Sequence, residues 1–321
     1  MKRRILPSIL ATLAILIGQI DLQAQQEQMY TQFMFNKLAI NPAFAGNEKY
    51  LGLTGLYRDQ WNGFPGAPQS QIFSVNLPKI GEKIGVGFNF KRQTIGIHTN
   101  INYSGIYSYK FPTQAGTFSM GIEFGGQNIR SDFSDPRLTA IEGIENDPSI
   151  PKINTNINAL NVGYGVYFNS NSFYVGASIP KLIRTDLDFD NNNRISEQVR
   201  HLFVMGGVAF PVARDLSMSV QSLLKFAENS PFDTDLNVSL TVDEKYTGGI
   251  NYRLGGANGD FGESIALLAA FQINEQMMIG LTQEFTLSKI RRFDNNSIEL
   301  VLHYGIGKKK SKVVLINPRY F

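Results

Sequence analysis

The stretch SIELVLHYGI, residues 297–306, alternates apolar and polar side chains along most of its length. Every second residue from Ile298 to Tyr304 is apolar, and the residues between them include Glu299 and His303. A period of two predicts a β-strand with one apolar and one polar face. Strands of soluble proteins typically have about five or six residues. A tilted strand needs about 9–11 residues to cross a bilayer, so this stretch fits a membrane strand.

The same alternation recurs from residue 50 onward, for example in KIGVGFNFK (83–91) and LNVSLTV (236–242). It predicts about fourteen strands, at 50–57, 70–77, 84–92, 101–110, 117–128, 158–168, 172–179, 202–211, 215–226, 234–242, 246–254, 264–273, 277–287 and 297–306. Aromatic residues and glycine are abundant, which is typical of a chain rich in strands. The sequence therefore predicts an all-β fold.

The connections between these strands alternate between short and long. The short ones are 78–83, 111–116, 169–171, 212–214, 243–245 and 274–276. The long ones are 58–69, 93–100, 129–157, 180–201, 227–233, 255–263 and 288–296. An antiparallel outer-membrane β-barrel has this pattern, because its periplasmic turns are tight and its surface loops are larger. An even number of strands would also place both termini in the periplasm.

In such a barrel the apolar face of each strand meets lipid and the polar face lines the lumen. Ionisable residues recur on the predicted polar face: Glu123, Lys225, Arg253, Glu284, Glu299 and His303. A charge facing lipid would cost a few kcal/mol near the midplane, so these residues are expected to face inward. We expect them to form ion pairs within the barrel, and a conducting or proton-handling path is the alternative.

The N-terminus is typical of a secretory signal peptide. A basic start (Lys2 to Arg4), an apolar run (Ile5 to Ile17) and a small-residue cleavage site ending at Ala24 follow one another. The mature chain would then comprise a periplasmic N-terminal segment, the barrel and a periplasmic C-terminal tail. The predicted boundaries are 1–24 for the signal peptide, 25–49 for the segment, 50–306 for the barrel and 307–321 for the tail.

The composition excludes several classes of protein. The chain has no cysteine, which excludes disulfides and thiolate metal sites. Its formal net charge of +3 falls to +1 without residues 1–24, and so small a charge gives no electrostatic case for binding nucleic acid. Motifs of P-loop enzymes, zinc proteases and serine hydrolases are missing, and the three histidines are far apart in the sequence. We expect no enzymatic activity and no cofactor.

The segment DLDFDNNNRISE (186–197) is similar to a calcium-binding loop. Acidic residues occupy positions 1, 3, 5 and 12 of that loop type, namely Asp186, Asp188, Asp190 and Glu197. Strands rather than helices flank the segment. An acidic, asparagine-rich surface loop that binds no metal is the alternative.

The stretch YRDQWNGFPGAPQS (57–70) is the first predicted surface loop and contains the only tryptophan of the chain. Its Asn-Gly and Pro-Gly pairs are turn formers. We expect a structural loop over the barrel mouth, with Trp61 as packing anchor and Arg58 turned to a lumen carboxylate. The alternative is direct contact with a protein partner. The candidate loop anchors or partner contacts are Tyr57, Arg58, Asp59, Gln60, Trp61, Phe64, Pro68 and Gln69.

Three segments resemble the PorP/SprF family of type IX secretion proteins from Bacteroidetes: YTQFMFNKLAINPAFAG (30–46), LYRDQWNGFPGAPQS (56–70) and the terminal NPRYF (317–321). The residues of the first segment that match the family's N-terminal motif are Asn41, Pro42, Ala43 and Gly46. Those of the second that match its early loop pattern are Arg58, Gln60, Trp61, Pro68 and Gln69. The resemblance extends over nearly the whole mature chain.

This resemblance implies an integral outer-membrane β-barrel that serves type IX secretion, in some members through export or surface anchoring of gliding adhesins. The implied partners are secreted cargo with a type IX C-terminal domain, the periplasmic ring components of the apparatus, and outer-membrane lipid. We therefore expect a secretion accessory without catalytic activity. The alternative is an outer-membrane channel or lipophile transporter of similar strand number.

Overall fold

In the computed structural model, the described residues are 27, 30–138, 143, 154–184, 199–228, 232–255 and 262–307. They contain four short 3₁₀-helices: η1 (Phe33–Phe35), η2 (Lys37–Ala39), η3 (Pro42–Phe44) and η4 (Lys289–Arg292). They also contain fourteen strands: β1 (Leu51–Asp59), β2 (Gln69–Asn76), β3 (Ile84–Ile95), β4 (His98–Pro112), β5 (Thr117–Ser131), β6 (Thr155–Asn169), β7 (Phe173–Ile179), β8 (His201–Ala213), β9 (Leu216–Ala227), β10 (Asp233–Val242), β11 (Tyr246–Leu254), β12 (Ser264–Gln272), β13 (Met277–Thr286) and β14 (Ser297–Ile306). No helix in this part of the chain is long and apolar enough to cross a membrane.

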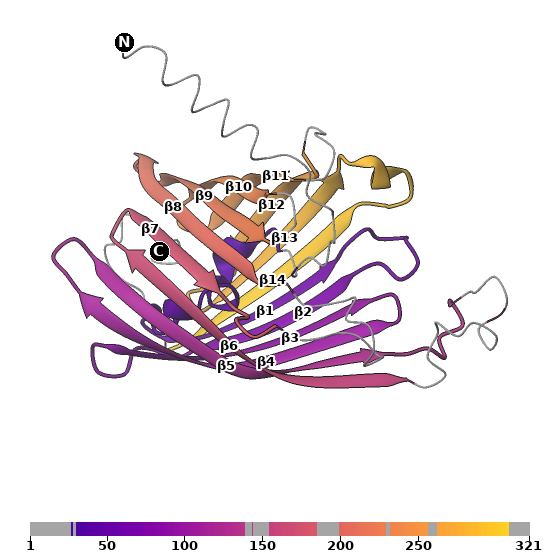
Figure 1. Ribbon diagram of the computed structural model, residues 1–321. Coiled ribbons are helices and arrows are strands. Elements are labelled where there is room, and N and C mark those ends of the chain that lie inside the picture. The colour runs from indigo at the N-terminus through magenta and orange to yellow at the C-terminus, as the bar shows by residue number, and fades with distance from the viewer. Residues whose placement is uncertain are drawn as a thin grey trace, which may run out of the picture.

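The strands form one closed barrel in which each strand pairs antiparallel with the next, and β14 pairs with β1. The predicted fold and all fourteen predicted strands are thereby confirmed. Tight turns such as 113–116 and 243–245 gather at one end of the barrel, at the left of Figure 1. Longer connections such as 60–68 and 287–296 gather at the other. We call these the turn end and the loop end.

The prediction of a long surface loop at 93–100 is wrong. Strand β3 continues to Ile95 and β4 begins at His98, so that only Gly96 and Ile97 connect them. Gly96 has a φ of 55°, which suits a tight two-residue hairpin turn. The tips of both strands are polar, and therefore the apolar alternation on which the prediction rested stops before the strands do.

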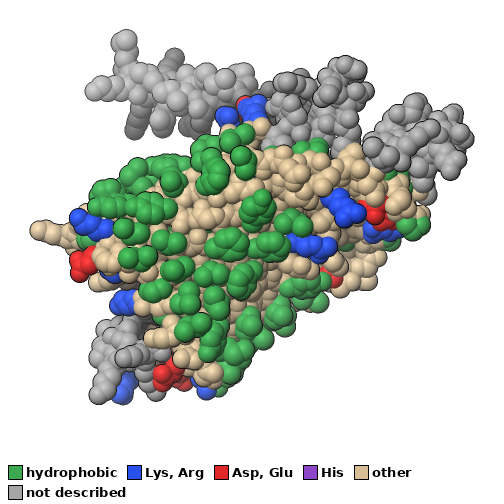
Figure 2. Space-filling model, turned by 90° about the horizontal axis from the view of Figure 1, so that it is seen from below, with side chains coloured by type: hydrophobic (Ala, Val, Ile, Leu, Met, Phe, Trp, Pro, Cys, Tyr) green, Lys and Arg blue, Asp and Glu red, His purple; other side chains and the backbone are tan. Residues whose placement is uncertain are grey.

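The outer wall of the barrel carries an apolar belt (Figure 2). Its side chains alternate along each strand, as Phe73, Phe88 and Leu302 do, and remain exposed. Near the turn end the belt is edged by aromatic rings: Tyr109, Phe111, Phe118, Phe168, Phe173, Phe210, Tyr246, Phe271 and Tyr304. A lipid-facing band bordered by aromatic residues is expected of an outer-membrane barrel, because aromatic side chains favour the membrane–water interface.

The lumen contains the chain's own N-terminal segment, which we call the plug (30–47). It includes η1, η2 and η3, and all of its residues are buried except Phe35 and Asn47, which are half-buried. From the sequence alone, residues 25–49 are instead expected to face periplasmic machinery. The structure differs because the apolar side chains of the plug pack against the inner wall rather than remaining in water.

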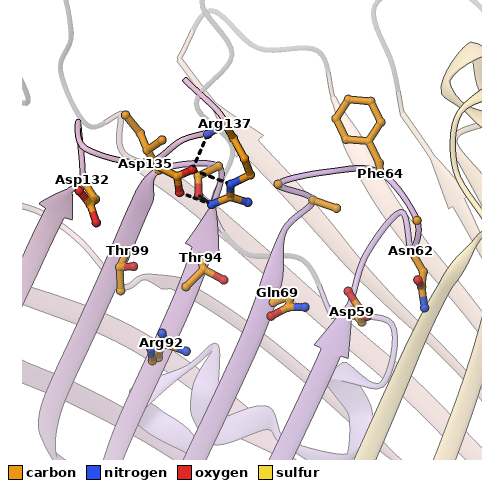
Figure 3. A pocket seen from close by; sticks show the side chains of 15 residues that line it. Asp59, Asn62, Phe64, Gln69, Arg92, Thr94, Thr99, Asp132, Asp135 and Arg137 are labelled. Carbon is orange, nitrogen blue, oxygen red and sulfur yellow. Dashed lines mark hydrogen bonds and ion pairs between the residues drawn. The ribbon is translucent and has the colours of Figure 1, made fainter. Parts of the chain in front are cut away.

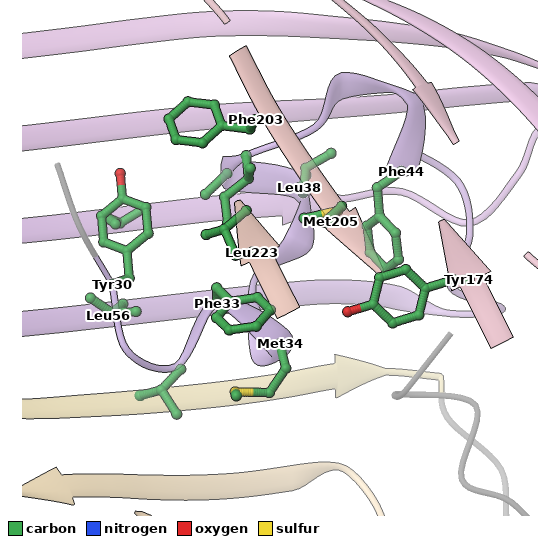
Figure 4. Close-up of a cluster of buried hydrophobic side chains, with 14 of the residues drawn as sticks. Tyr30, Phe33, Met34, Leu38, Phe44, Leu56, Tyr174, Phe203, Met205 and Leu223 are labelled. Carbon is green, nitrogen blue, oxygen red and sulfur yellow. The ribbon is translucent and has the colours of Figure 1, made fainter. Parts of the chain in front are cut away.

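An apolar cluster fixes the plug against β7, β8 and β9 (Figure 4). Phe33 and Leu38 of the plug belong to the same buried cluster as Tyr174, Met205 and Leu223 of the wall. Full burial of one large apolar side chain stabilises a fold by about 1.5–3 kcal/mol. The cluster therefore provides a large part of the free energy that keeps the plug in the lumen.

The two ends of the described chain lie toward opposite ends of the barrel. The Glu27 carboxylate lies 3.0 Å from Nζ of Lys181, and its backbone N–H donates to His201. Lys181 follows β7 and His201 begins β8, so both lie at the loop end. Gly307 follows β14 at the turn end. Both termini of the mature chain are expected from the sequence to lie in the periplasm. Residues 1–26, including the predicted signal peptide, lie outside the described residues.

Candidate functional site

Arg58 connects the plug to the inner wall of the barrel. Its Nη1 lies 2.9 Å from Oε2 of Glu284 on β13 and 3.2 Å from Oε2 of Glu299 on β14. The same nitrogen donates a hydrogen bond to Oγ1 of Thr31 in the plug, at 3.0 Å. All four side chains are buried. Arg58 is expected from the sequence to face a lumen carboxylate, and in the structure it contacts two.

The plug donates further hydrogen bonds to these carboxylates. The backbone N–H groups of Thr31 and Gln32 reach Glu299 at 2.9 Å and 2.6 Å, and the Thr31 hydroxyl reaches Glu284 at 2.7 Å. Hydrogen bonds to a charged group contribute about 1.5–3 kcal/mol each. The start of the plug is therefore held by two carboxylates that belong to β13 and β14.

A second arginine extends the network around the lumen. Arg253 lies 3.1 Å from Glu284 and 2.8 Å from Asp235, and Nζ of Lys225 lies 2.7 Å from Asp235. The ion pairs that the sequence predicts inside the barrel are thus present. Four carboxylates surround three cations in this network: Asp233, Asp235, Glu284 and Glu299 around Arg58, Arg253 and Lys225. Donors from the plug offset this excess of negative charge.

The family motif Asn41, Pro42, Ala43 and Gly46 lies in the plug. Asn41 caps η3 because its Oδ1 accepts from the Ala43 N–H at 2.9 Å, and Pro42 takes the first helical position. The other side of the Asn41 amide donates to the Val166 carbonyl on β6 at 2.9 Å. Gly46 has a φ of 71°, a conformation that suits glycine. The motif therefore shapes the plug and fastens it to the wall.

Glycines of the wall make room for this motif. An added Cβ at Gly121 of β5 would lie 2.3 Å from the Ala43 nitrogen, and one at Gly165 of β6 would lie 2.2 Å from the Asn41 side chain. At Gly85 of β3 it would lie 2.0 Å from a plug carbonyl. These strands carry glycine where the plug approaches the backbone of the wall closely.

At the loop end, backbone hydrogen bonds join the neighbouring connections into one rim. The first loop, 60–68, bonds to the β13–β14 connection through Asn62 and Asn296 at 2.8 Å. It bonds on its other side to the β3–β4 hairpin, where the Gly96 N–H donates to the Gly66 carbonyl at 2.8 Å. The rim is therefore continuous from β14 to β4, and the loop is supported on both sides.

A cavity of about 460 Å³ lies within this rim, between β1–β4 and the connections above them (Figure 3). Its strand residues include Asp59, Gln69, Arg92 and Thr94, which occupy the outward-facing positions of their strands. Polar side chains here replace the apolar ones found nearer the middle of the same strands. The cavity therefore lies on the outer side of the wall, beyond the apolar belt. It offers hydrogen-bonding groups rather than an apolar surface.

Asp135 and Arg137 close the far side of the cavity (Figure 3). Nε of Arg137 donates to Asp135 at 2.9 Å, and its Nη2 donates to the Gly96 carbonyl at 3.1 Å. Hydrogen bonds from the Arg137 side chain and backbone lower the pKa of Asp135 to about 2. Because the pKa of Asp135 is lowered, its interaction with Arg137 stabilises the folded loop at any pH above the ordinary Asp pKa. This stabilisation is lost only as the pH falls through about 2.

We expect Arg137→Ala to loosen residues 132–138 from the hairpin without unfolding the barrel. An exposed ion pair contributes little, so hydrogen exchange in 132–138 should rise by less than about tenfold. In the wild-type protein, the hydrogen-exchange rate of these residues, corrected for the pH dependence of intrinsic amide exchange, should not change between pH 5 and 8, because Asp135 stays ionised there. Lys79→Ala, an exposed cation at the turn end, is the control. Equal exchange in Arg137→Ala and wild type would contradict this role.

The structure places the predicted loop residues in several different surroundings. Arg58 faces the lumen, Tyr57 lies on the outer wall with 39% of its surface exposed, and Phe64 is exposed in the loop. Asp59 and Gln69 line the rim cavity. The others shape the loop: the backbone N–H of Gln60 donates to the Pro68 carbonyl, and that of Trp61 donates to the Ser297 hydroxyl.

Sequence reasoning missed Asp233, Asp235 and the whole plug. The signal for Asp235 was present, because the polar face of Asn237, Ser239 and Thr241 continues backward through it with a period of two. The candidate calcium loop Asp186, Asp188, Asp190 and Glu197 lies outside the described residues. Among the residues described, no cluster of three or more His, Asp or Glu could hold a metal ion.

A closed antiparallel barrel with an apolar belt and a polar, plugged lumen defines an integral outer-membrane β-barrel protein. Residues 22–304 match the family described as type IX secretion system membrane protein PorP/SprF. The chain belongs to this family, as the resemblance of its motifs indicates.

The chain is similar to several solved structures at low sequence identity. Outer membrane protein Omp33 of Acinetobacter baumannii is 9% identical, with 81% of this chain and 100% of that chain covered and a TM-score of 0.46. A FadL homologue of Pseudomonas aeruginosa is 11% identical, with coverage of 90% and 95% and a TM-score of 0.47. The CymD monoaromatic hydrocarbon channel is 9% identical, with coverage of 87% and 93% and a TM-score of 0.49. No curated protein matches the chain.

Proposed function

We propose that this barrel assists the export and surface anchoring of type IX cargo, including gliding adhesins, by holding an exported protein at its loop end. The observation that carries the proposal is the plug, together with membership of the type IX family. A lumen occupied by the eighteen residues of the plug, which are fixed by hydrogen bonds to a buried ion-pair network, suits a docking protein better than a passage for cargo.

The proposal includes an orientation in the membrane. The loop end faces the cell exterior and the turn end faces the periplasm, because outer-membrane barrels have short periplasmic turns and longer external loops. The proposed partners are cargo proteins with a type IX C-terminal domain on the outside and the ring components of the apparatus in the periplasm. In this orientation the tail 307–321 begins on the periplasmic side.

The rim offers aromatic side chains for contact with cargo. Phe64 is 43% exposed and Trp61 is half-buried in the first loop, and aromatic side chains often dominate the binding energy of interfaces. Tyr57 is a weaker candidate because it lies within the lipid-facing belt. The proposal therefore assigns the contact to Trp61 and Phe64 and leaves Tyr57 to the membrane.

Deletion of the gene tests the proposed function. We expect surface-bound adhesin to fall strongly and to return when the wild-type gene is restored, while the amount of adhesin made stays constant. Restoration with Trp61→Ala should give a folded, heat-modifiable barrel that retains less adhesin. Unchanged adhesin export and retention in the deletion strain would overturn the proposal. A Trp61→Ala barrel that fails to assemble would assign that residue to the fold alone.

A further inference from the structure

Strands β5 and β6 project beyond their neighbour β7 at the loop end, as Figure 1 shows. Strand β6 has 15 residues and pairs with β5 along its whole length, from Thr155 to Asn169. Strand β7 has only 7 residues and pairs with β6 from Tyr164 to Asn169. Within the described part of the chain, the first part of β6 therefore has a neighbouring strand on one side only.

The free side of β6 can be followed residue by residue. Val162 is covered there, because its carbonyl accepts from the Leu182 N–H at 2.9 Å and its own N–H donates to the Asn161 side chain at 2.8 Å. Backbone groups of successive strand residues point to opposite sides, so those of Leu160, Asn158 and Asn156 point the same way as those of Val162. No described residue pairs with the backbone N–H or C=O groups of these three on that side.

This edge lies outside the apolar belt. Leu160 is the last apolar residue on the outer face of β6, and Asn158 and Asn156 follow it as exposed residues. The Asn128 side chain on β5 donates to both of these asparagine side chains, at 2.7 Å and 2.6 Å. Unpaired backbone groups would be costly in lipid but are tolerated in water, so an open edge is compatible with this position beyond the belt.

The chemistry of the edge defines what could cover it. Six residues from Thr155 to Leu160 span about 20 Å of extended chain, and their free backbone groups match those of an added β-strand. On the inner face Ile157 pairs with Ile129 of β5, whereas the outer face carries the asparagines. A matching strand would therefore place apolar side chains inward and polar ones outward.

We propose that the free edge of β6 receives an extended segment of the exported cargo, which adds to the barrel wall as one more antiparallel strand. Strand addition to an exposed edge is an established mode of peptide recognition, in which main-chain hydrogen bonds provide affinity and alternate side chains provide specificity. The inference rests on the proposed function, since it specifies how the cargo is held.

The test uses the full barrel in detergent and a purified type IX C-terminal domain as the probe. Asn158→Pro removes the edge N–H while leaving the ladder with β5 intact, because residue 158 does not donate on that side. We expect its affinity for the domain to fall about tenfold or more. Asn158→Ala keeps the N–H and should bind within about twofold of wild type. Hydrogen exchange at Asn156, Asn158 and Leu160 should be fast in the wild-type barrel and slow with the domain bound.

The outcomes separate this inference from the proposed function. Binding that is equal in wild type and Asn158→Pro, without protection of the β6 amides, would overturn strand addition and leave the docking function standing. A domain that does not bind wild type at all would overturn both. Amides of 156–160 that are already protected in the barrel alone would show the edge to be occupied by the chain itself or a second copy, which also overturns the inference. If Asn158→Pro does not assemble, hydrogen exchange of residues 156–160 in the wild-type barrel, measured with and without the domain, still tests strand addition.

Discussion

The Arg58→Ala variant is expected to lose about 3–5 kcal/mol of stability, because removal of one partner leaves buried charges uncompensated. Glu299 would lose its cation in the ion-pair network, and Glu284 would keep only Arg253. The plug hydrogen bonds to both carboxylates, so its docking should weaken together with the wall. Urea unfolding of the barrel in detergent would give the stability, and protease cleavage within 30–47 would report release of the plug.

Two further variants make this result specific. Arg130→Ala removes an exposed arginine on the outer side of β5 and should change stability by less than about 0.5 kcal/mol. Adding Glu299→Gln to Arg58→Ala removes the unpaired negative charge and should recover part of the loss. If Arg58→Ala unfolds at the same urea concentration as Arg130→Ala, the network does not hold the plug.

The Gly121→Leu variant is expected to expel the plug while the barrel still closes. A side chain at this position would meet the Ala43 nitrogen at 2.3 Å and the Pro42 carbonyl carbon at 2.4 Å. Both atoms belong to the backbone and cannot rotate away, so docking should weaken by about 3 kcal/mol. Proteases should then cleave the plug rapidly, and planar-bilayer recordings should show higher conductance than wild type.

Gly105→Leu is the matched control for this experiment. Gly105 lies on β4, beside β5, and a Cβ there meets no atom within 4 Å. The added leucine joins the lipid-facing belt and should leave both plug and conductance unchanged. Steady conductance in wild type equal to that of Gly121→Leu would show that the plug does not close the lumen, and would favour the alternative of an open channel.

The alternation of side chains was sufficient to predict most of the wall. Each membrane strand needs apolar residues on its lipid face, so the period of two in stretches such as 236–242 and 297–306 is imposed by the bilayer and is visible without any partner. The same reasoning failed over 93–100, where the strand tips leave the bilayer and both faces are polar. It also did not show that β7 stops short of β6, because strand pairing depends on both neighbours.

The plug could not be predicted in this way. Residues 30–46 contain apolar side chains without a sustained period of two or 3.6, and three separate 3₁₀ turns arrange them. Their shape is specified by surfaces that only the closed barrel brings together, such as Gly85, Gly121 and Gly165 on three strands. The resemblance identified Asn41, Pro42, Ala43 and Gly46 as a motif, but their contacts appear only in the lumen.

The sequence by itself determined the class of this protein: a chain with fourteen strands whose apolar faces require lipid and whose polar faces require a lumen. This was possible because the preference of each side chain for lipid or water can be read from neighbouring residues in the sequence. The tertiary structure alone decided what fills the lumen, which carboxylates Arg58 meets, and where β7 stops pairing with β6. Those features depend on residues far apart in the chain, such as Thr31 and Glu299, that become neighbours only when β14 closes on β1.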